Sequence, residues 1–163
     1  MTLTSQAVID SALTSATMPA ATNAAAVPTD VKYVENLAVA LAQSTSTAIF
    51  NISGAVAILH IQGKVSTQIQ NQANSTYLEH TFLGNICGAV DIDNDSSSVR
   101  YHISGVTTDA LIKSGTDYPK FATTIKVLEE GSIKLNCAAS STGNIDWKVV
   151  YRPLSSGATI TAA

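Results

Sequence analysis

The chain has 163 residues and little charge, with nine Lys and Arg against 12 Asp and Glu, so that only 13% of the residues are charged. A typical soluble domain carries about 25% charged residues, and the net charge of -3 gives this chain no basic surface for nucleic acid. Its longest apolar runs, Leu37 to Ala42 and Ala55 to Leu59, are far shorter than the roughly 20 residues that span a bilayer. We therefore expect neither nucleic acid nor membrane as a partner.

The first 28 residues consist mainly of Ala, Thr and Ser, with Asp10 as the one charged residue among them. Such a segment has too few large apolar side chains to form a core alone. We expect an extended N-terminal arm that becomes ordered against a partner. A disordered leader is the alternative.

The next segment predicts a short α-helix capped by Thr29 or Asp30. Apolar residues follow at the i, i+3, i+4, i+7 spacing of one helix face, and the polar run 43–47 ends the helix. These residues are Val34, Leu37, Ala38 and Leu41. We expect this stripe to pack on the chain's own core or at a trimer axis, so residues 1–46 form an arm-and-helix unit.

From residue 47 onward the apolar pattern alternates with a period of two, and turn residues recur about every ten positions. The pattern predicts a mainly β domain over residues 47–163, an antiparallel β-sandwich or barrel of the jelly-roll-like kind. The predicted strands are Ala48–Ile52, Ala55–Ile61, Val65–Gln70, Thr76–Phe82, Gly88–Ile92, Val99–Ile103, Phe121–Leu128, Ser132–Cys137 and Ile145–Tyr151.

Alternation within the strands also predicts which side chains face the core. Trp147, Val149 and Tyr151 are the expected core anchors of the strand near the C-terminus, and they share their face with Ile145. In the segment 121–128 the corresponding row is Phe121, Thr123, Ile125 and Val127. The opposite faces carry mostly Thr, Ser, Gln and Asn, which suits contact with other subunits.

Residues suited to metal binding or redox chemistry are isolated. His60, His80 and His102 each stand alone in a predicted strand, without the HxH or HExxH spacing of a metal site. We expect them to be exposed or satisfied locally. Cys87 and Cys137 lie outside any CxxC motif, and we expect two free buried thiols in preference to a disulfide.

The acidic segment Asp91 to Asp95 resembles the start of a calcium loop, with Asp at 91, 93 and 95 and Asn94 between them. The pattern then fails, because Ser96 occupies the glycine position and His102 the position of the bidentate Glu. We interpret the segment as a solvated hairpin turn, with adventitious calcium binding as the alternative. No nucleophile elbow or phosphate loop occurs, so we expect neither an enzyme nor a cofactor.

Two stretches carry a resemblance to known proteins, Gly54–Gln72 and Leu135–Ala163, together with the segment 91–95. They resemble small β-rich structural proteins of tailed-bacteriophage virions, and the resemblance extends from Ala48 to the C-terminus. It implies a capsid cement or decoration protein, commonly a trimer, that is made in the cytoplasm of a bacterial host and binds the major capsid protein or other virion proteins.

Three hypotheses for function remain. The first is a capsid cement protein, and the second is a tail, neck or fibre component of the virion. The third is a non-viral function, such as a carbohydrate-binding β-sandwich or a hydrolase. Paired solvent-facing aromatic residues would favour the carbohydrate-binding alternative, but the chain has a single Trp in core register.

Overall fold

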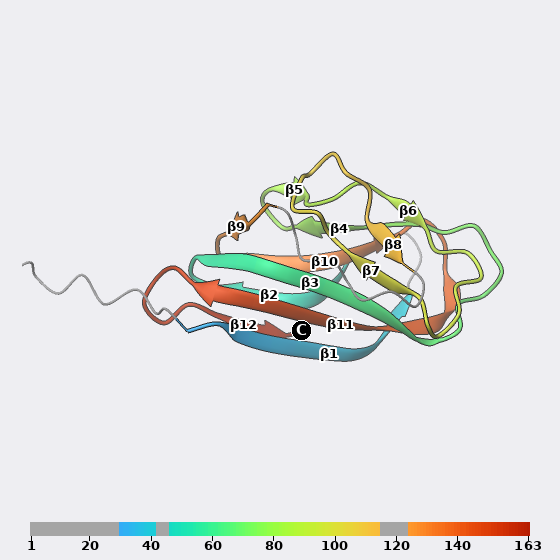
Figure 1. Ribbon diagram of the computed structural model, residues 1–163, viewed down its shortest axis with the longest axis horizontal. Coiled ribbons are helices and arrows are strands. Elements are labelled where there is room, and N and C mark those ends of the chain that lie inside the picture. The colour runs from blue at the N-terminus through green and yellow to red at the C-terminus, as the bar shows by residue number, and fades with distance from the viewer. Residues whose placement is uncertain (1–29, 42–45, 115–123) are drawn as a thin grey trace, which may run out of the picture.

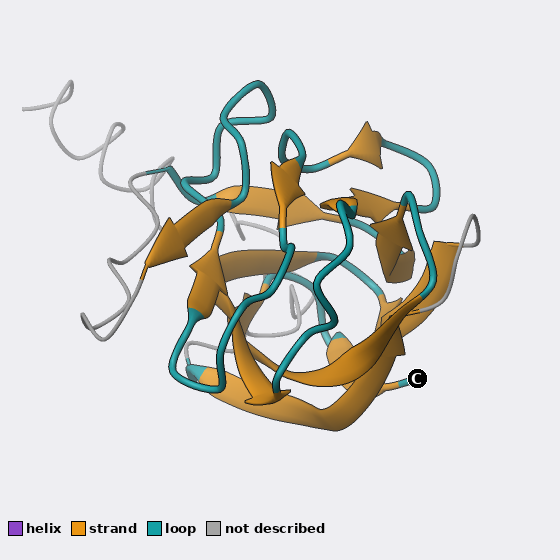
Figure 2. Cartoon of the chain, turned by 90° about the vertical axis from the view of Figure 1, so that its right-hand side faces the viewer, coloured by secondary structure: helices purple, strands orange, loops and turns teal. Residues whose placement is uncertain are grey.

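The computed structural model describes residues 30–41, 46–114 and 124–163, and these are mainly β, with two antiparallel sheets and no closed barrel (Figure 1). The described ranges contain no helix (Figure 2). The predicted arm, residues 1–28, lies outside them. The strands are β1 Lys32–Leu41, β2 Ser46–Ser53, β3 Val56–Thr67, β4 Ser75–His80, β5 Gly84–Asn85, β6 Val90–Asp91, β7 Arg100–His102, β8 Ile112–Ser114, β9 Lys126–Leu128, β10 Gly131–Cys137, β11 Ser141–Pro153 and β12 Thr159–Ala162.

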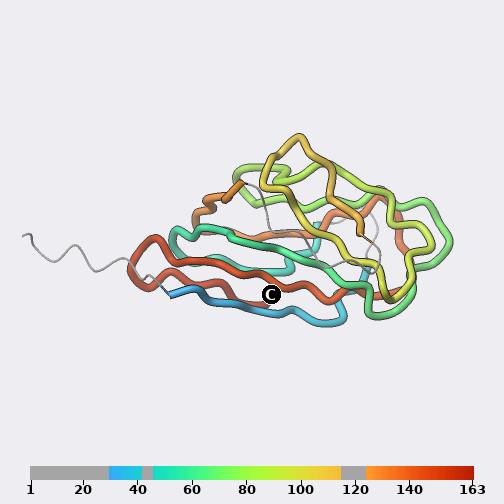
Figure 3. Tube along the Cα trace, viewed as in Figure 1, coloured from blue at the N-terminus to red at the C-terminus, as the bar shows by residue number. Residues whose placement is uncertain are grey.

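The first four strands alternate between the two sheets, and so do the last three. Sheet A has the order β1-β11-β3-β7-β8, with β9 also paired to β3, and sheet B has the order β12-β2-β10-β4-β5, with β6 also paired to β4. β3 and β11 pair from Val56 opposite Pro153 to Thr67 opposite Asn144, and they run side by side over most of their length (Figure 3). The mainly β, antiparallel class expected from the sequence is confirmed.

One hydrophobic core joins the inward side chains of both sheets. Sheet A contributes Trp147, Val149 and Tyr151, of which Trp147 is fully buried, and sheet B contributes Phe50 and Leu78. Burying each large apolar side chain stabilises the fold by about 1.5–3 kcal/mol relative to leaving it in water. The expected inward row of β11 therefore lies in this core.

A glycine makes room for the Trp147 ring. Gly63 of β3 is opposite Trp147 of β11, and a Cβ atom at Gly63 would lie 2.9 Å from two carbons of the indole and 2.9 Å from Cγ2 of Ile145. A glycine inside a strand weakens that strand unless another group approaches its backbone closely. Here the indole ring makes that approach.

The predicted N-terminal helix is wrong, because its residues form strand β1 of sheet A. β1 pairs with β11 from Lys32 opposite Tyr151 to Leu41 opposite Ser141. A register shift between Asn36 and Val39 inserts one extra residue, which is a β-bulge. Because the bulge changes the spacing of apolar residues along the strand, the sequence imitates helical periodicity.

Several strand boundaries also differ from the prediction. The predicted strands 55–61 and 65–70 are one continuous strand, β3, and β12 at the C-terminal end was not predicted. In the last part of the segment 121–128, Val127 and Ile125 are exposed whereas Leu128 is buried, so the inward row there is the opposite one. Phe121 and Thr123 lie outside the described residues.

Candidate functional site

The four residues of the predicted helix stripe do not share one face. Leu41 is buried in the core and Val34 packs partly against it, whereas Leu37 and Ala38 are exposed. Ala38 has a positive φ of 55°, which places it in the left-handed region at the bulge. The stripe is therefore divided between the core and the edge of sheet A.

Three polar contacts hold β1 in place. The side-chain amide of Asn36 donates a 2.8 Å hydrogen bond to the Ile49 carbonyl of β2, which ties the edge of sheet A to sheet B. The Ala38 N–H donates to Asp146 Oδ1 at 2.8 Å, and Glu35 forms an ion pair with Lys148. Because all three partners are distant in sequence, the position and the bulge of β1 depend on the folded sheets.

Exposed apolar side chains lie along β1 and the residue just before it. Val31, Tyr33 and Leu37 are 55%, 62% and 59% exposed. We call this set, with the unpaired side of β1, the β1 edge. In sheet A, β1 pairs only with β11, and no second strand pairs with it among the described residues. The β1 edge thus combines apolar side chains with a row of unpaired backbone groups.

A second exposed apolar group lies at the β4–β5 hairpin. Phe82 and Leu83 occupy the turn between these strands, with Phe82 76% exposed. The ring of Phe82 makes an edge contact with His80, with ring centroids 6.1 Å apart. We call this turn the Phe82 tip.

The outward side of sheet B carries a different chemistry. Ser132 donates a 2.8 Å hydrogen bond to Asn51 Oδ1 on the neighbouring strand, and Ser46 donates to Glu79. Opposite Asn51 on its other side is Thr161 of β12. The side chains of this face therefore satisfy one another across the strands, a pairing typical of sheet surfaces.

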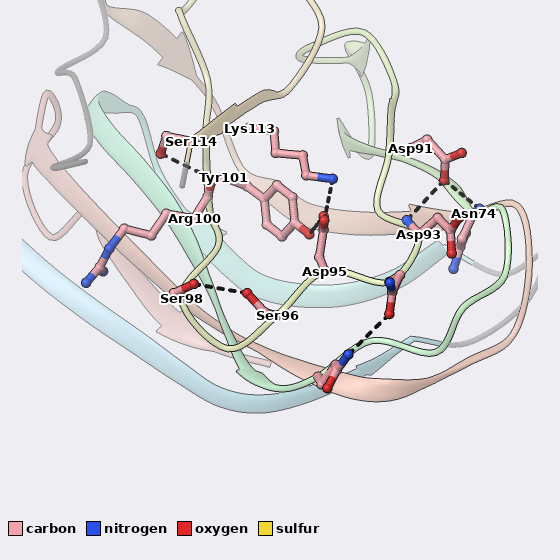
Figure 4. A network of polar contacts seen from close by, with 12 residues as sticks. Asn74, Asp91, Asp93, Asp95, Ser96, Ser98, Arg100, Tyr101, Lys113 and Ser114 are labelled. Carbon is pink, nitrogen blue, oxygen red and sulfur yellow. Dashed lines mark hydrogen bonds and ion pairs between the residues drawn. The ribbon is translucent and has the colours of Figure 1, made fainter. Parts of the chain in front are cut away.

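The acidic segment 91–95 forms a network whose carboxylates point in different directions (Figure 4). Asp91 Oδ1 accepts hydrogen bonds from the backbone N–H of Asn74 at 2.9 Å and of Asp93 at 3.1 Å. Asp95 is buried and is bonded to Tyr101 and Lys113 instead (Figure 4). Within the described ranges no three His, Cys, Asp or Glu side chains are grouped so that they could hold a metal ion.

Asp95 anchors the loop that follows β6 to sheet A. Tyr101 of β7 is fully buried, and Lys113 stands opposite it on β8. Burial raises the pKa of Tyr101, and the hydrogen bond to Asp95 and its negative charge raise it further. Tyr101 therefore stays a hydrogen-bond donor at all physiological pH values, so this cluster is suited to holding a loop in place.

All three histidines are buried, His60 in β3 and His102 in β7 of sheet A and His80 in β4 of sheet B. Burial lowers the pKa of His60 in β3 and of His80 in β4. His80 is bonded to the Glu129 carbonyl through Nε2, at 3.2 Å, and its Nδ1 accepts from the Phe82 N–H at 3.4 Å. His60 and His102 each make at least one further polar or ring interaction.

Both cysteines are free and buried. Burial raises the pKa of the Cys87 thiol and of the Cys137 thiol. A raised pKa disfavours the reactive thiolate, so these positions are suited to packing.

The sequence did not point to Val31, Tyr33 or the Phe82 tip as surface features. Val31 and Tyr33 are two residues apart, which is the spacing of one strand face. That signal was available, but the helical spacing of the following residues obscured it.

Comparison with known protein families, with curated proteins and with solved structures gives no match for this chain. None of the described residues belongs to a helix long and apolar enough to cross a membrane.

Proposed function

We propose that this chain is a non-enzymatic structural protein of a tailed-bacteriophage virion, a cement or decoration protein that binds over the major capsid protein and stabilises the shell. The observation that carries the proposal is the β1 edge, where Val31, Tyr33 and Leu37 expose apolar surface on a chain with only 13% charged residues. Exposed apolar surface beside an unpaired strand is typical of a contact with other protein.

We further assign the two sheets to the jelly-roll group. Their strand orders support this assignment, since β1-β11-β3-β7 and β2-β10-β4-β5 interleave the first and second halves of the chain. Domains of this kind serve many functions, so the fold alone says nothing about the place in the virion. The resemblance of the strand segments supplies that part of the proposal, including assembly as a trimer.

A tail, neck or fibre component is the second candidate, because the same apolar edge would serve a contact at one vertex of a particle. A carbohydrate-binding module has less support. Trp147 is the single Trp of the chain and is fully buried, so its ring is not available to stack on a sugar.

The copy number of this chain in purified particles tests the proposal. A cement protein is present in numbers comparable to the major capsid protein, and mass spectrometry with labelled standard peptides of both proteins gives the ratio. A ratio near one-to-one supports the cement function. A few copies per particle would replace it with the tail or neck function, and absence from the particle would end the virion proposal.

A further inference from the structure

The edges of the two sheets differ greatly in length. The other edge of sheet A is formed by β8 and β9, with three residues each, and the edges of sheet B by β12, with four residues, and by β5 and β6, with two each. β1 has ten residues. Short edge strands are one of the means by which proteins avoid unwanted pairing. In the described part of the chain, β1 is the edge that lacks this protection.

The regular part of β1 ends at its bulge. Register with β11 is uninterrupted from Lys32 to Asn36 and shifts before Val39. Glu35 is neutralised by its ion pair with Lys148, which leaves Lys32 as the uncompensated charge of the regular part. Val31 and Tyr33 flank Lys32 and are both exposed. Lys32 to Asn36 therefore form a nearly neutral edge strand, with Asp30 and Val31 just before it, and one side of its backbone has no strand partner among the described residues.

We propose that β1 pairs in antiparallel fashion with β1 of a second copy of this chain, in a register centred on Tyr33. Identical antiparallel neighbours are related by a two-fold axis normal to the sheet, so opposite residues must lie on the same face. Centring on Tyr33 places Tyr33 opposite its own copy and Val31 opposite Glu35 of the second copy. The pairing then uses all of the segment 30–36 and stops at the bulge.

Charge excludes one neighbouring register and the bulge excludes the other. A pair centred on Lys32 would set two lysines directly opposite each other, which destabilises a sheet. A pair centred on Val34 would place Val31 opposite Leu37 of the second copy, inside the bulge where the ladder is irregular. With Tyr33 at the centre, Lys32 is opposite Val34 of the second copy, and no like charges are directly opposed.

Each cross-strand pair contributes roughly 0.2–1 kcal/mol, so an edge of seven residues gives a weak contact. Such a contact forms in solution at high protein concentration, and the high local concentration of an assembled surface favours it further. It uses the same β1 edge as the proposed function, but it is tested in solution without particles, so that either can fail without the other. It is compatible with a trimer contact made elsewhere on the chain, because it joins one strand to one strand.

The mass of the full chain in solution, measured by light scattering and sedimentation at rising concentration, tests this pairing. Tyr33→Lys and Tyr33→Glu each place like charges at the two-fold axis, and Phe82→Lys is the matched control at another exposed aromatic residue. As the protein concentration rises, we expect the mass of the wild type to double. The two Tyr33 variants should keep the lower, unpaired mass. Each Tyr33 variant should pair at least about tenfold more weakly, and Phe82→Lys should pair as the wild type does.

An equimolar mixture of Tyr33→Lys and Tyr33→Glu is the most specific test. In mixed pairs, unlike charges meet at the two-fold axis, so pairing should recover. A wild-type mass that does not depend on concentration would overturn the proposal, as would a mixture that fails to recover or an equal effect of Phe82→Lys. Hydrogen exchange of the wild-type amides from Lys32 to Asn36 gives a readout that needs no variant. Exchange should slow with concentration, whereas protection that is the same at all concentrations would show that the chain's own residues cover β1.

Discussion

The β1 edge and the outward side of sheet B both carry few charges, yet they differ in what their polar groups do. On sheet B, side chains such as Ser132 and Asn51 bond to one another across neighbouring strands. On β1, the side chains that face water are apolar, and one row of backbone groups has no strand partner among the described residues. A surface with few charges can therefore satisfy its own hydrogen-bonding groups, as sheet B does. The β1 edge instead keeps a row of backbone groups that has no strand partner among the described residues.

This difference changes the interpretation of the composition. From the sequence, the faces covered by Thr, Ser, Gln and Asn and the uncharged arm looked equally suited to contact with other subunits. The structure separates these polar faces from the β1 edge. We therefore propose β1 as the assembly surface and expect substitutions on the outward face of sheet B to have little effect.

The largest expected effect, on the free energy of unfolding, comes from truncating a side chain of the core that lies beneath both surfaces. Trp147→Ala should lower the free energy of unfolding by about 3–5 kcal/mol, because it leaves a cavity beneath Gly63 and Ile145. Denaturant unfolding measures the change. Tyr33→Ala, a substitution of an exposed aromatic residue, is the control and should change stability by less than about 0.5 kcal/mol. Equal losses in the two variants would mean that Trp147 is not a core anchor.

The bulge that ends the regular part of β1 gives a smaller effect of opposite sign. Ala38 has a φ of 55°, where a Cβ atom is unfavourable, so Ala38→Gly should stabilise the chain by about 1 kcal/mol. Thermal unfolding measures the gain. Ala40→Gly is the matched control on the same strand and should be destabilising, because Ala40 is not in the left-handed region. Destabilisation by Ala38→Gly would show that the bulge does not hold this backbone conformation.

Both sheets bury histidines, among them His60 in sheet A and His80 in sheet B. Burial lowers the pKa of both below the ordinary value of 6.5, so the folded state binds protons more weakly than the unfolded state does. Their contribution to stability is therefore complete above pH 6.5 and is lost as the pH falls below it. Unfolding measured on either side of this value should show the loss. The variants His80→Gln and His60→Gln should each remove part of this loss of stability at low pH. An unchanged pH dependence in both variants would contradict the burial argument.

Much of the fold could be predicted from local sequence, because strands such as β11 bury one face and follow a period of two. For this reason the inward positions of Trp147, Val149 and Tyr151 could be predicted from the sequence. β1 could not be predicted in the same way, since its bulge is fixed by Asp146, 108 residues away from Ala38. The spacing of Val34, Leu37 and Ala38 fits a helix only when that contact is unknown.

The acidic segment shows a similar limit. Alternate Asp residues predict either a turn or a cation loop, and local sequence cannot say where each carboxylate points. The choice depends on Tyr101 and Lys113, which lie on β7 and β8 and bond to Asp95. Contacts between segments thus decide both the site that the sequence suggested and the edge that it missed.

Incorporation into particles tests most directly whether the β1 edge is the assembly surface. Cells that produce the particles would express the wild-type chain together with Tyr33→Lys or Asn51→Lys, two substitutions at exposed positions. Mass spectrometry of purified particles gives the ratio of variant to wild type, relative to the ratio in the cell. We predict that Tyr33→Lys is depleted from particles and that Asn51→Lys is incorporated as the wild type is. Equal incorporation of the two variants, or depletion of Asn51→Lys alone, would contradict the account.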